Sequence, residues 1–157
     1  MKKLIALSMI IFGIACSNSG SGEKKETPAA SEQKEAENGN PSYDPHRGEG
    51  KFTKVDISPN LDVAKAEAGE KVFTIKCSAC HKLTDERLVG PGWKGVTSRH
   101  TPEWIMNFTT NTDEMIDKDP KAQAMLEICL VRMPNQNLTD DDARNVYEFM
   151  RKNDGVK

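Results

Sequence analysis

The stretch that decides the fold is Cys77-Ser78-Ala79-Cys80-His81. It places two thiols three positions apart and an imidazole directly after the second thiol. A disulfide would use both thiols but would give His81 no task. A thioredoxin-like redox pair belongs at a helix start in an α/β pattern, and strand-like runs are nearly absent here. A zinc site would need a second Cys/His cluster at ligand spacing, and the sequence holds none.

The chemistry that uses all three side chains is covalent attachment of haem. The thiols of Cys77 and Cys80 would each add to one haem vinyl group to form two thioethers, and His81 would place an imidazole nitrogen beneath the iron. A single motif of this kind predicts one covalently bound haem c. Because such attachment takes place outside the cytoplasm, the motif also predicts an exported protein.

The iron of an electron carrier needs a second strong axial ligand. The candidates that follow the motif are Met106, Met115, Met125, Met133 and His100. Met106 and Met125 fall on predicted helices, where methionine usually fills the core, and Met115 falls in a polar turn. Met133 follows a helix end and precedes Pro134, so it lies on non-helical backbone that can present a thioether to the iron. Met133 is therefore the predicted ligand.

His81, the later Leu88-Val89-Gly90-Pro91-Gly92 and Met133-Pro134 occur in this order along the chain. In this the chain resembles a class I, mono-haem cytochrome c over roughly residues 61–152. The resemblance implies an all-α fold in which the N- and C-terminal helices cross around one haem. It also implies that the backbone carbonyl of Pro91 binds the second nitrogen of His81, a contact that fixes the ring and raises its donor strength.

Helix signals agree with that fold. Caps and apolar spacing predict helices over residues 62–76, from Thr101-Pro102, over 120–130 after Asp119, and from Thr139 onward. The apolar positions of the first helix are Val63, Ala66, Val72, Phe73 and Ile75, and those of the last are Ala143, Val146, Tyr147 and Met150.

Gly69 lies on the first predicted helix. In the family a glycine there lets the first helix cross the last one closely, against aromatic residues on both, and Gly69, Phe73 and Tyr147 match that pattern. The alternative is that Gly69 only weakens its helix, by about 1 kcal/mol relative to alanine.

Several side chains are candidate haem contacts. The indole N–H of Trp93 or Trp104 needs a partner if buried and could donate to a haem propionate, as could Arg99 or Lys94. The alternative is that the tryptophans pack in the core and the cations are solvated. The remaining cysteine, Cys129, is expected to be a buried, inert thiol.

Residues 1–16 have the features of an export signal. Lys2 and Lys3 precede an apolar run that is too short to be a permanent membrane span. The run ends at Gly13-Ile14-Ala15-Cys16, which resembles a bacterial lipoprotein lipobox, although the family usually has leucine where Gly13 stands. This predicts a protein on the periplasmic side of a bacterial membrane, lipid-anchored through Cys16. The alternative is an ordinary secretory leader and a soluble periplasmic protein.

Residues 17–50 are rich in Ser, Gly, Glu, Lys and Pro, a composition that predicts a disordered linker. A flexible coil of this length has an end-to-end distance of roughly 30–35 Å. His46 within it is expected to be solvated. Residues 51–157 then form the single folded domain.

Composition narrows the function. The 157 residues carry 22 basic and 24 acidic side chains, which argues against nucleic acid as a partner. From Lys51 onward there are 16 basic and 17 acidic residues, so net charge does not indicate the sign of a protein partner. Iron held by histidine and methionine has no open position. We therefore expect a monomeric single-electron carrier, not an enzyme, that docks transiently with a redox donor and acceptor at the haem edge.

The stretch from Trp104-Ile105-Met106 to Met133-Pro134-Asn135-Gln136 resembles small cytochromes that carry electrons from membrane respiratory components to terminal or denitrifying reductases, including nitrous oxide reductase. The alternative function is a haem sensor or a peroxidase-like haem protein, which would follow if Met133 were a labile ligand.

Overall fold

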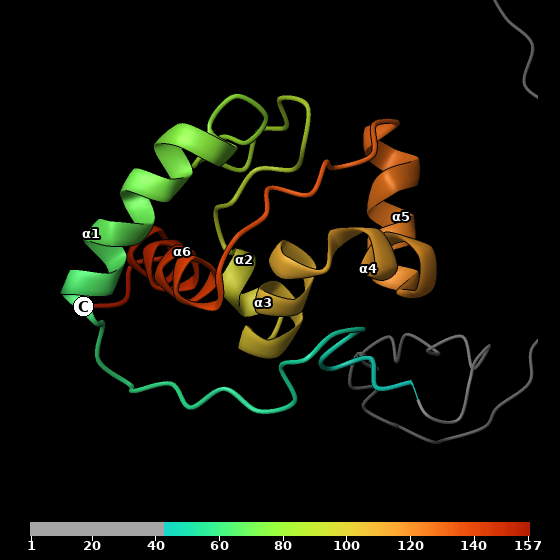
Figure 1. Cartoon of the computed structure of the whole chain (residues 1–157). Helices are drawn as coiled ribbons and strands as arrows, with labels where there is room; N and C mark the ends of the chain where they lie inside the picture. Colours follow the sequence, from blue (N-terminus) through green and yellow to red (C-terminus); the bar gives the residue numbers. More distant parts are fainter. Residues whose placement is uncertain (1–42) are drawn as a thin grey trace, which may run out of the picture. The chain divides into compact units, whose positions relative to one another are not determined.

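The computed structural model describes residues 43–157, which form a helical domain (Figure 1). Its helices are α1 (Val63–Val72), the π-helical turn η1 (Phe73–Cys77), α2 (Val96–Arg99), α3 (Pro102–Thr110), α4 (Thr112–Lys118), α5 (Pro120–Cys129) and α6 (Asp140–Asn153). Within the described range the only β-type pairing is an isolated bridge between His81 and Arg87, which confirms the predicted all-α fold. No helix of this range has the length and apolar character needed to cross a bilayer. The predicted leader, with Cys16, lies outside the described residues.

The longer helices begin at polar caps. The N-cap residues are Asp62, Thr101, Asp119 and Thr139. In each case the side chain accepts a hydrogen bond from the backbone N–H three positions later, which satisfies a donor left free in the first turn. Asp142 returns the contact to the backbone of Thr139, completing a capping box. These are the starts that the sequence predicts.

Helices α1 and α6 cross at Gly69 (Figure 1). A Cβ atom placed on Gly69 would lie 2.0 Å from the backbone oxygen of Asn145, so only glycine fits between the two backbones. Beside the crossing, the ring centroids of Phe73 and Phe149 are 5.4 Å apart. The predicted crossing is thus present, but the aromatic partner of Phe73 on α6 is Phe149. Tyr147, the residue expected in that place, is also buried on α6.

Three expectations about the core are wrong. Val63 and Ile75, assigned to the apolar face of the first helix, are 59% and 81% exposed. Met115, expected in a polar turn, is fully buried on α4. The helix is short and mostly charged, and its buried face consists of Thr112, Met115 and Ile116.

The predicted linker ends too late, because residues 43–50 pack on the domain. The side-chain amide of Asn107 donates to the carbonyl oxygens of Arg47 (2.8 Å) and Phe52 (2.9 Å). The backbone N–H of Glu49 donates to the sulfur of Met115 at 2.9 Å. The contacts use the backbone of this segment, which explains why its polar composition does not reveal them. His46 is exposed, as expected.

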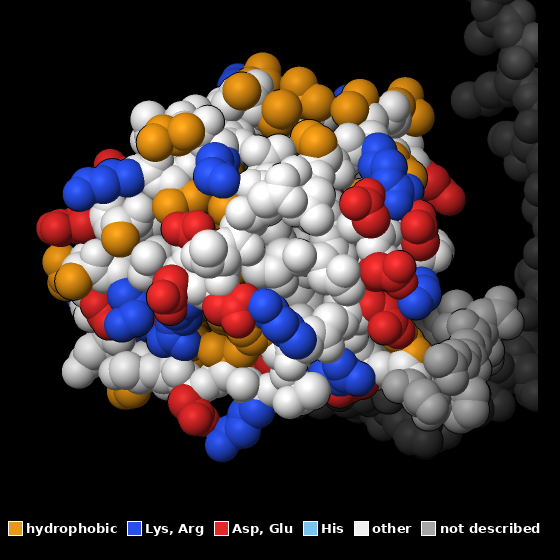
Figure 2. Space-filling model, viewed as in Figure 1, with side chains coloured by type: hydrophobic (Ala, Val, Ile, Leu, Met, Phe, Trp, Pro, Cys, Tyr) orange, Lys and Arg blue, Asp and Glu red, His pale blue; other side chains and the backbone are white. Residues whose placement is uncertain are grey.

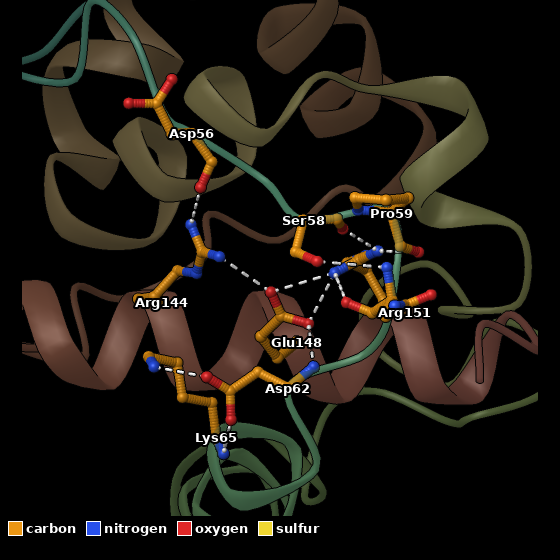
Figure 3. Close-up of polar contacts among 9 residues, drawn as sticks. Asp56, Ser58, Pro59, Asp62, Lys65, Arg144, Glu148 and Arg151 are labelled. Carbon is orange, nitrogen blue, oxygen red and sulfur yellow. Dashed lines mark hydrogen bonds and ion pairs between the residues drawn. The ribbon is translucent and has the colours of Figure 1, made fainter.

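The segment leading into α1 is bound to α6 by a buried ion-pair network (Figure 3). Glu148 is fully buried and pairs with Arg144 at 2.9 Å and Arg151 at 2.8 Å. Arg151 also donates to the carbonyl oxygens of Ser58 (2.8 Å) and Pro59 (3.1 Å). These bonds satisfy the buried charges and fix the chain entering α1.

Candidate functional site

The two motif cysteines lie where α1 ends in the π-helical turn. The backbone N–H of Ser78 donates to the carbonyl of Phe73 at 2.9 Å, the long-range bond of such a turn, and π-helical turns occur frequently at functional sites. The N–H groups of Cys80 and His81 both donate to the carbonyl of Cys77 at 3.0 Å, which makes the motif compact. Cys77 is buried and Cys80 is half-buried. Burial raises the pKa of the Cys77 thiol to about 11, so in this folded state it stays protonated at neutral pH.

The imidazole of His81 is fixed on one side. Its Nδ1 lies 2.9 Å from the carbonyl oxygen of Pro91, and because a carbonyl can only accept, Nδ1 must carry the proton. Burial lowers the pKa of His81, although the Pro91 carbonyl acts in the opposite direction. The ring is therefore neutral and its Nε2 has a free electron pair. Gly90 lies against the ring: a Cβ there would be 2.3 Å from Cε1.

An apolar cavity opens beside His81, with about 590 Å³ of space between atoms that includes its opening to solvent. Apart from His81 and Arg132 its wall is formed by apolar or sulfur-containing side chains and one glycine. The lining residues are Cys80, His81, Val89, Gly90, Pro91, Phe108, Ile116, Ala122, Met125, Leu126, Cys129, Val131, Arg132, Met133 and Pro134.

Of the predicted axial candidates, Met133 and Met125 line the cavity together with His81. Met106 and Met115 are buried but do not line it. His100 does not line it either; its ring stacks on Trp104 with centroids 4.0 Å apart, and burial lowers its pKa to about 4.

Met125 is the cavity residue whose role the sequence did not indicate. It was expected to fill the core of its helix, but it lines the cavity from α5 beside Met133. Cys129, one turn further along α5, was expected to be buried; it is half-buried and lines the same wall. Both face the cavity because the apolar side of α5 forms part of its wall. The spacing of 125, 126 and 129 on one helix face could have indicated this.

Both tryptophans are buried in the core, as the alternative interpretation expected. Trp93 does not line the cavity. The centroid of its ring lies 5.7 Å from that of His81 and 4.7 Å from that of Phe73. The indole N–H of Trp104 donates to the fully buried carboxylate of Asp119 at 2.9 Å, and Trp104 as a haem contact stays a prediction. Its hydrogen-bonding group is therefore already used within the protein.

Arg99 lines a second hollow that shares Pro91, Met125 and Cys129 with the apolar cavity. Its guanidinium donates to the carbonyl oxygens of Lys94 (2.6 Å) and Gly92 (3.2 Å). Arg87 and Lys94 also line this hollow, against one acidic residue, Asp85. The hollow is therefore cationic and suited to carboxylate groups.

The residues present fit a covalently attached haem. The two thiols of Cys77 and Cys80 are three positions apart in the sequence, and a neutral imidazole is fixed through Nδ1 with its Nε2 free. The adjoining cavity is apolar and contains a thioether at Met133. No three His, Cys, Asp or Glu side chains of residues 43–157 cluster as they would around a zinc ion.

Comparison with known proteins agrees with this geometry. The sequence profile of the cytochrome c family matches residues 66–154, which is more than half of the chain. The chain belongs to the cytochrome c family. Its cofactor is a covalently bound c-type haem, for which Cys77 and Cys80 are positioned, and the family carries out haem-based electron transfer. Cytochromes c of this kind are typically exported to the periplasm.

Solved structures show the same fold. A cytochrome c from Rhodothermus marinus superposes with a TM-score of 0.64 at 33% identity, covering 67% of this cytochrome c and 90% of the other chain. An engineered form of that protein, bound to a carbene intermediate, gives a TM-score of 0.61 at 32% identity over the same shares.

A curated relative, the cytochrome c-type cyt cy of Rhodobacter capsulatus, is 40% identical over 47 residues. The match covers 30% of this cytochrome c and spans about a quarter (24%) of the length of the relative.

Proposed function

We propose that this cytochrome c is a single-electron carrier with one haem, whose iron is held by His81 and Met133. The observation that supports this ligand pair is their presence on the wall of one apolar cavity, with Nε2 of His81 free. With both axial positions filled there is no open site for a substrate, and a methionine ligand raises the reduction potential relative to histidine. We therefore infer electron transfer without enzymatic turnover.

When bound, the haem would supply a one-electron change at its iron, and the side chains of the protein would hold it and exclude water from it. Cys77 and Cys80 tether the ring, and the Pro91 carbonyl keeps the imidazole of His81 oriented and raises its donor strength. The apolar wall excludes water and so favours the less charged, reduced state. Arg99, in the wall of the cationic hollow, is the candidate partner for the carboxylate groups of the haem.

The proposed docking face lies at the cavity mouth. Figure 2 shows hydrophobic side chains gathered along the upper edge of the molecule, where the loop after η1 approaches the end of α5. The exposed apolar residues of these two segments are Leu83, Leu88, Val89, Ile128, Leu130 and Val131. An exposed apolar patch beside a cofactor suits a partner that binds briefly. We propose that the monomer carries electrons there from membrane respiratory components to a terminal or denitrifying reductase.

The proposed location is the periplasmic side of a bacterial membrane, with the protein anchored through lipid on Cys16. Support comes from the lipobox-like sequence Gly13-Ile14-Ala15-Cys16 and from the export typical of the family.

The ligand pair is tested with Met133→Ala. If the sulfur of Met133 binds the iron, oxidised wild-type protein has a weak far-red sulfur-to-iron charge-transfer band, and the reduced protein resists carbon monoxide. We expect Met133→Ala to lose that band, to lower the reduction potential and to bind carbon monoxide readily, because one axial position opens. Absorption spectroscopy and a redox titration of the haem-loaded protein measure these changes.

Met125→Leu is the matched control, since Met125 lines the same cavity from a helix. It should keep the band. If Met133→Ala keeps it and Met125→Leu loses it, Met125 is the ligand and the pair proposed here is wrong.

The alternative is a haem sensor or a peroxidase-like protein. The structure of an engineered Rhodothermus marinus cytochrome c similar to this chain has a carbene intermediate bound. Comparable reactivity in this chain would need an open coordination position at the iron. Ready binding of carbon monoxide by the wild-type reduced protein would favour this alternative over the electron carrier.

A further inference from the structure

The segment that carries Met133 has few polar links to the rest of the described chain. It begins after Leu130, whose backbone is left-handed (φ 59°), and residues 131–138 form no helix. Among the described residues, two side chains link it to other elements by hydrogen bonds. Lys76 donates to the carbonyl oxygen of Gln136 at 2.9 Å, and Arg132 binds α4.

Arg132, directly before Met133, makes the larger contact. Its Nε lies 3.3 Å from a carboxylate oxygen of Asp113, and its Nη2 lies 2.9 Å from one of Asp117. Nη2 also donates to the backbone oxygen of Asp113 at 3.1 Å. The two acids lie four positions apart on one face of α4, so the planar guanidinium spans both. Hydrogen bonding to Asp117 raises the pKa of Arg132.

Helix α4 is a rigid support for this contact. Met115 is fully buried and Ile116, 4% exposed, lines the cavity from the same helix. Arg132 lines the cavity as well. The ion pairs therefore join the segment of Met133 to a helix that forms part of the cavity wall.

We propose that Arg132 is a positioning residue that keeps Met133 on the iron by holding its segment against Asp113 and Asp117. This inference rests on the proposed ligation by Met133. When the thioether leaves the iron, the segment must move away from the cavity, and a neighbouring residue fixed to α4 restricts that movement.

The expected effect is modest because the groups are exposed: Arg132 by 42%, Asp113 by 62% and Asp117 by 60%. Exposed ion pairs are weak and screened by salt. We expect Arg132→Gln to raise the rate at which Met133 leaves the iron about two- to fivefold. The measurement mixes reduced, haem-loaded protein with saturating carbon monoxide, so that the observed rate reports loss of Met133. The reduction potential should fall as well.

Matched variants separate positioning from general stability. Asp117→Asn should raise the rate as Arg132→Gln does, and it tests the inference even if Arg132→Gln does not fold. Arg132→Lys should restore part of the wild-type rate. Lys118→Gln is the control, because Lys118 pairs with Glu114 on the same helix at 2.5 Å without contacting the segment; its rate should equal the wild type.

Salt gives an independent readout. Raising the salt to 1 M should speed carbon monoxide binding in the wild type and leave Arg132→Gln unchanged, since only the wild type has the pairs to screen. Equal rates in wild type, Arg132→Gln and Asp117→Asn overturn the positioning role alone. If Met133→Ala leaves the spectrum unchanged, the ligation is wrong, and the positioning role fails with it.

Discussion

Gly90 lies against the imidazole of His81 with no space for a side chain. An added Cβ would be 2.3 Å from Cε1 and 2.8 Å from Nδ1 of the ring. Gly90→Ala should therefore move the ring or the loop and lengthen the bond to Pro91. Overpacking of this kind costs about 1–3 kcal/mol. We expect the haem-loaded variant to unfold at a lower urea concentration than the wild type and to have a shifted reduction potential.

Leu88→Ala is the control for Gly90→Ala, because Leu88 is in the same loop and is 50% exposed. A surface truncation changes stability by about 0.5 kcal/mol or less. Equal unfolding midpoints for Gly90→Ala and the wild type would show that the ring does not depend on this close approach.

At the scale of residues, the groups that act on the cofactor could be predicted from the sequence, whereas the contacts of the side chains around them could not. The motif alone identified Cys77, Cys80 and His81, because covalent attachment restricts their spacing. It could not reveal that Trp104 donates to Asp119. The phenol of Tyr43, 76 positions before Asp119, donates to the same carboxylate, and burial together with this bond raises the pKa of Tyr43. Which partner a buried donor finds is decided by the tertiary fold.

At the scale of elements, Gly69→Ala distinguishes the two roles considered for Gly69, because they predict changes of opposite sign in the free energy of unfolding. If Gly69 only weakens α1, alanine should stabilise the protein by about 1 kcal/mol. If Gly69 is needed for the crossing, the new Cβ meets the backbone of Asn145 at 2.0 Å and alanine destabilises. We expect a loss of about 1–3 kcal/mol, measured by urea unfolding. Increased stability would contradict the contact.

Helix starts were predictable because each depends on one cap and the residues just after it. Thr139 and Asp142 are an example, since the capping box is encoded within four positions. Helix α4 was not predicted, because only Met115 and Ile116 among its seven residues are large and apolar. It is stabilised by tertiary contacts, and such contacts are not visible in a short sequence window.

At the scale of the whole molecule, the anchor at Cys16 is the prediction to test. Each acyl chain would contribute about 0.8 kcal/mol per buried methylene, and two chains are needed for stable attachment. Cys16→Ser should therefore move the protein from the membrane fraction to the soluble periplasmic fraction. Haem staining of the two fractions detects this shift. Mass spectrometry of the wild-type mature terminus is the control. A wild-type terminus without lipid would indicate an ordinary secretory leader.

The extent of the domain was only partly predictable. Composition placed the boundary at residue 50, yet the structure includes Tyr43 and the residues after it. The binding groups for this segment come from distant elements, such as Asn107 on α3 and Lys121 on α5, which donates to Pro45 at 3.0 Å. The composition of a segment indicates only its average polarity. These contacts depend instead on which individual groups the fold brings together.

The crossing of α1 and α6 also sets an order of events during synthesis. The partners of Gly69 are Asn145 and Phe149, which a ribosome adding about 5–20 residues per second reaches on the order of 3 to 14 s after Cys80. Until then α1, with 10 residues, is too short to be a stable helix alone. The thiol of Cys77 is therefore not yet shielded. A chain that is exported before α6 has packed on α1 therefore presents the Cys77 thiol for thioether formation while it is still accessible.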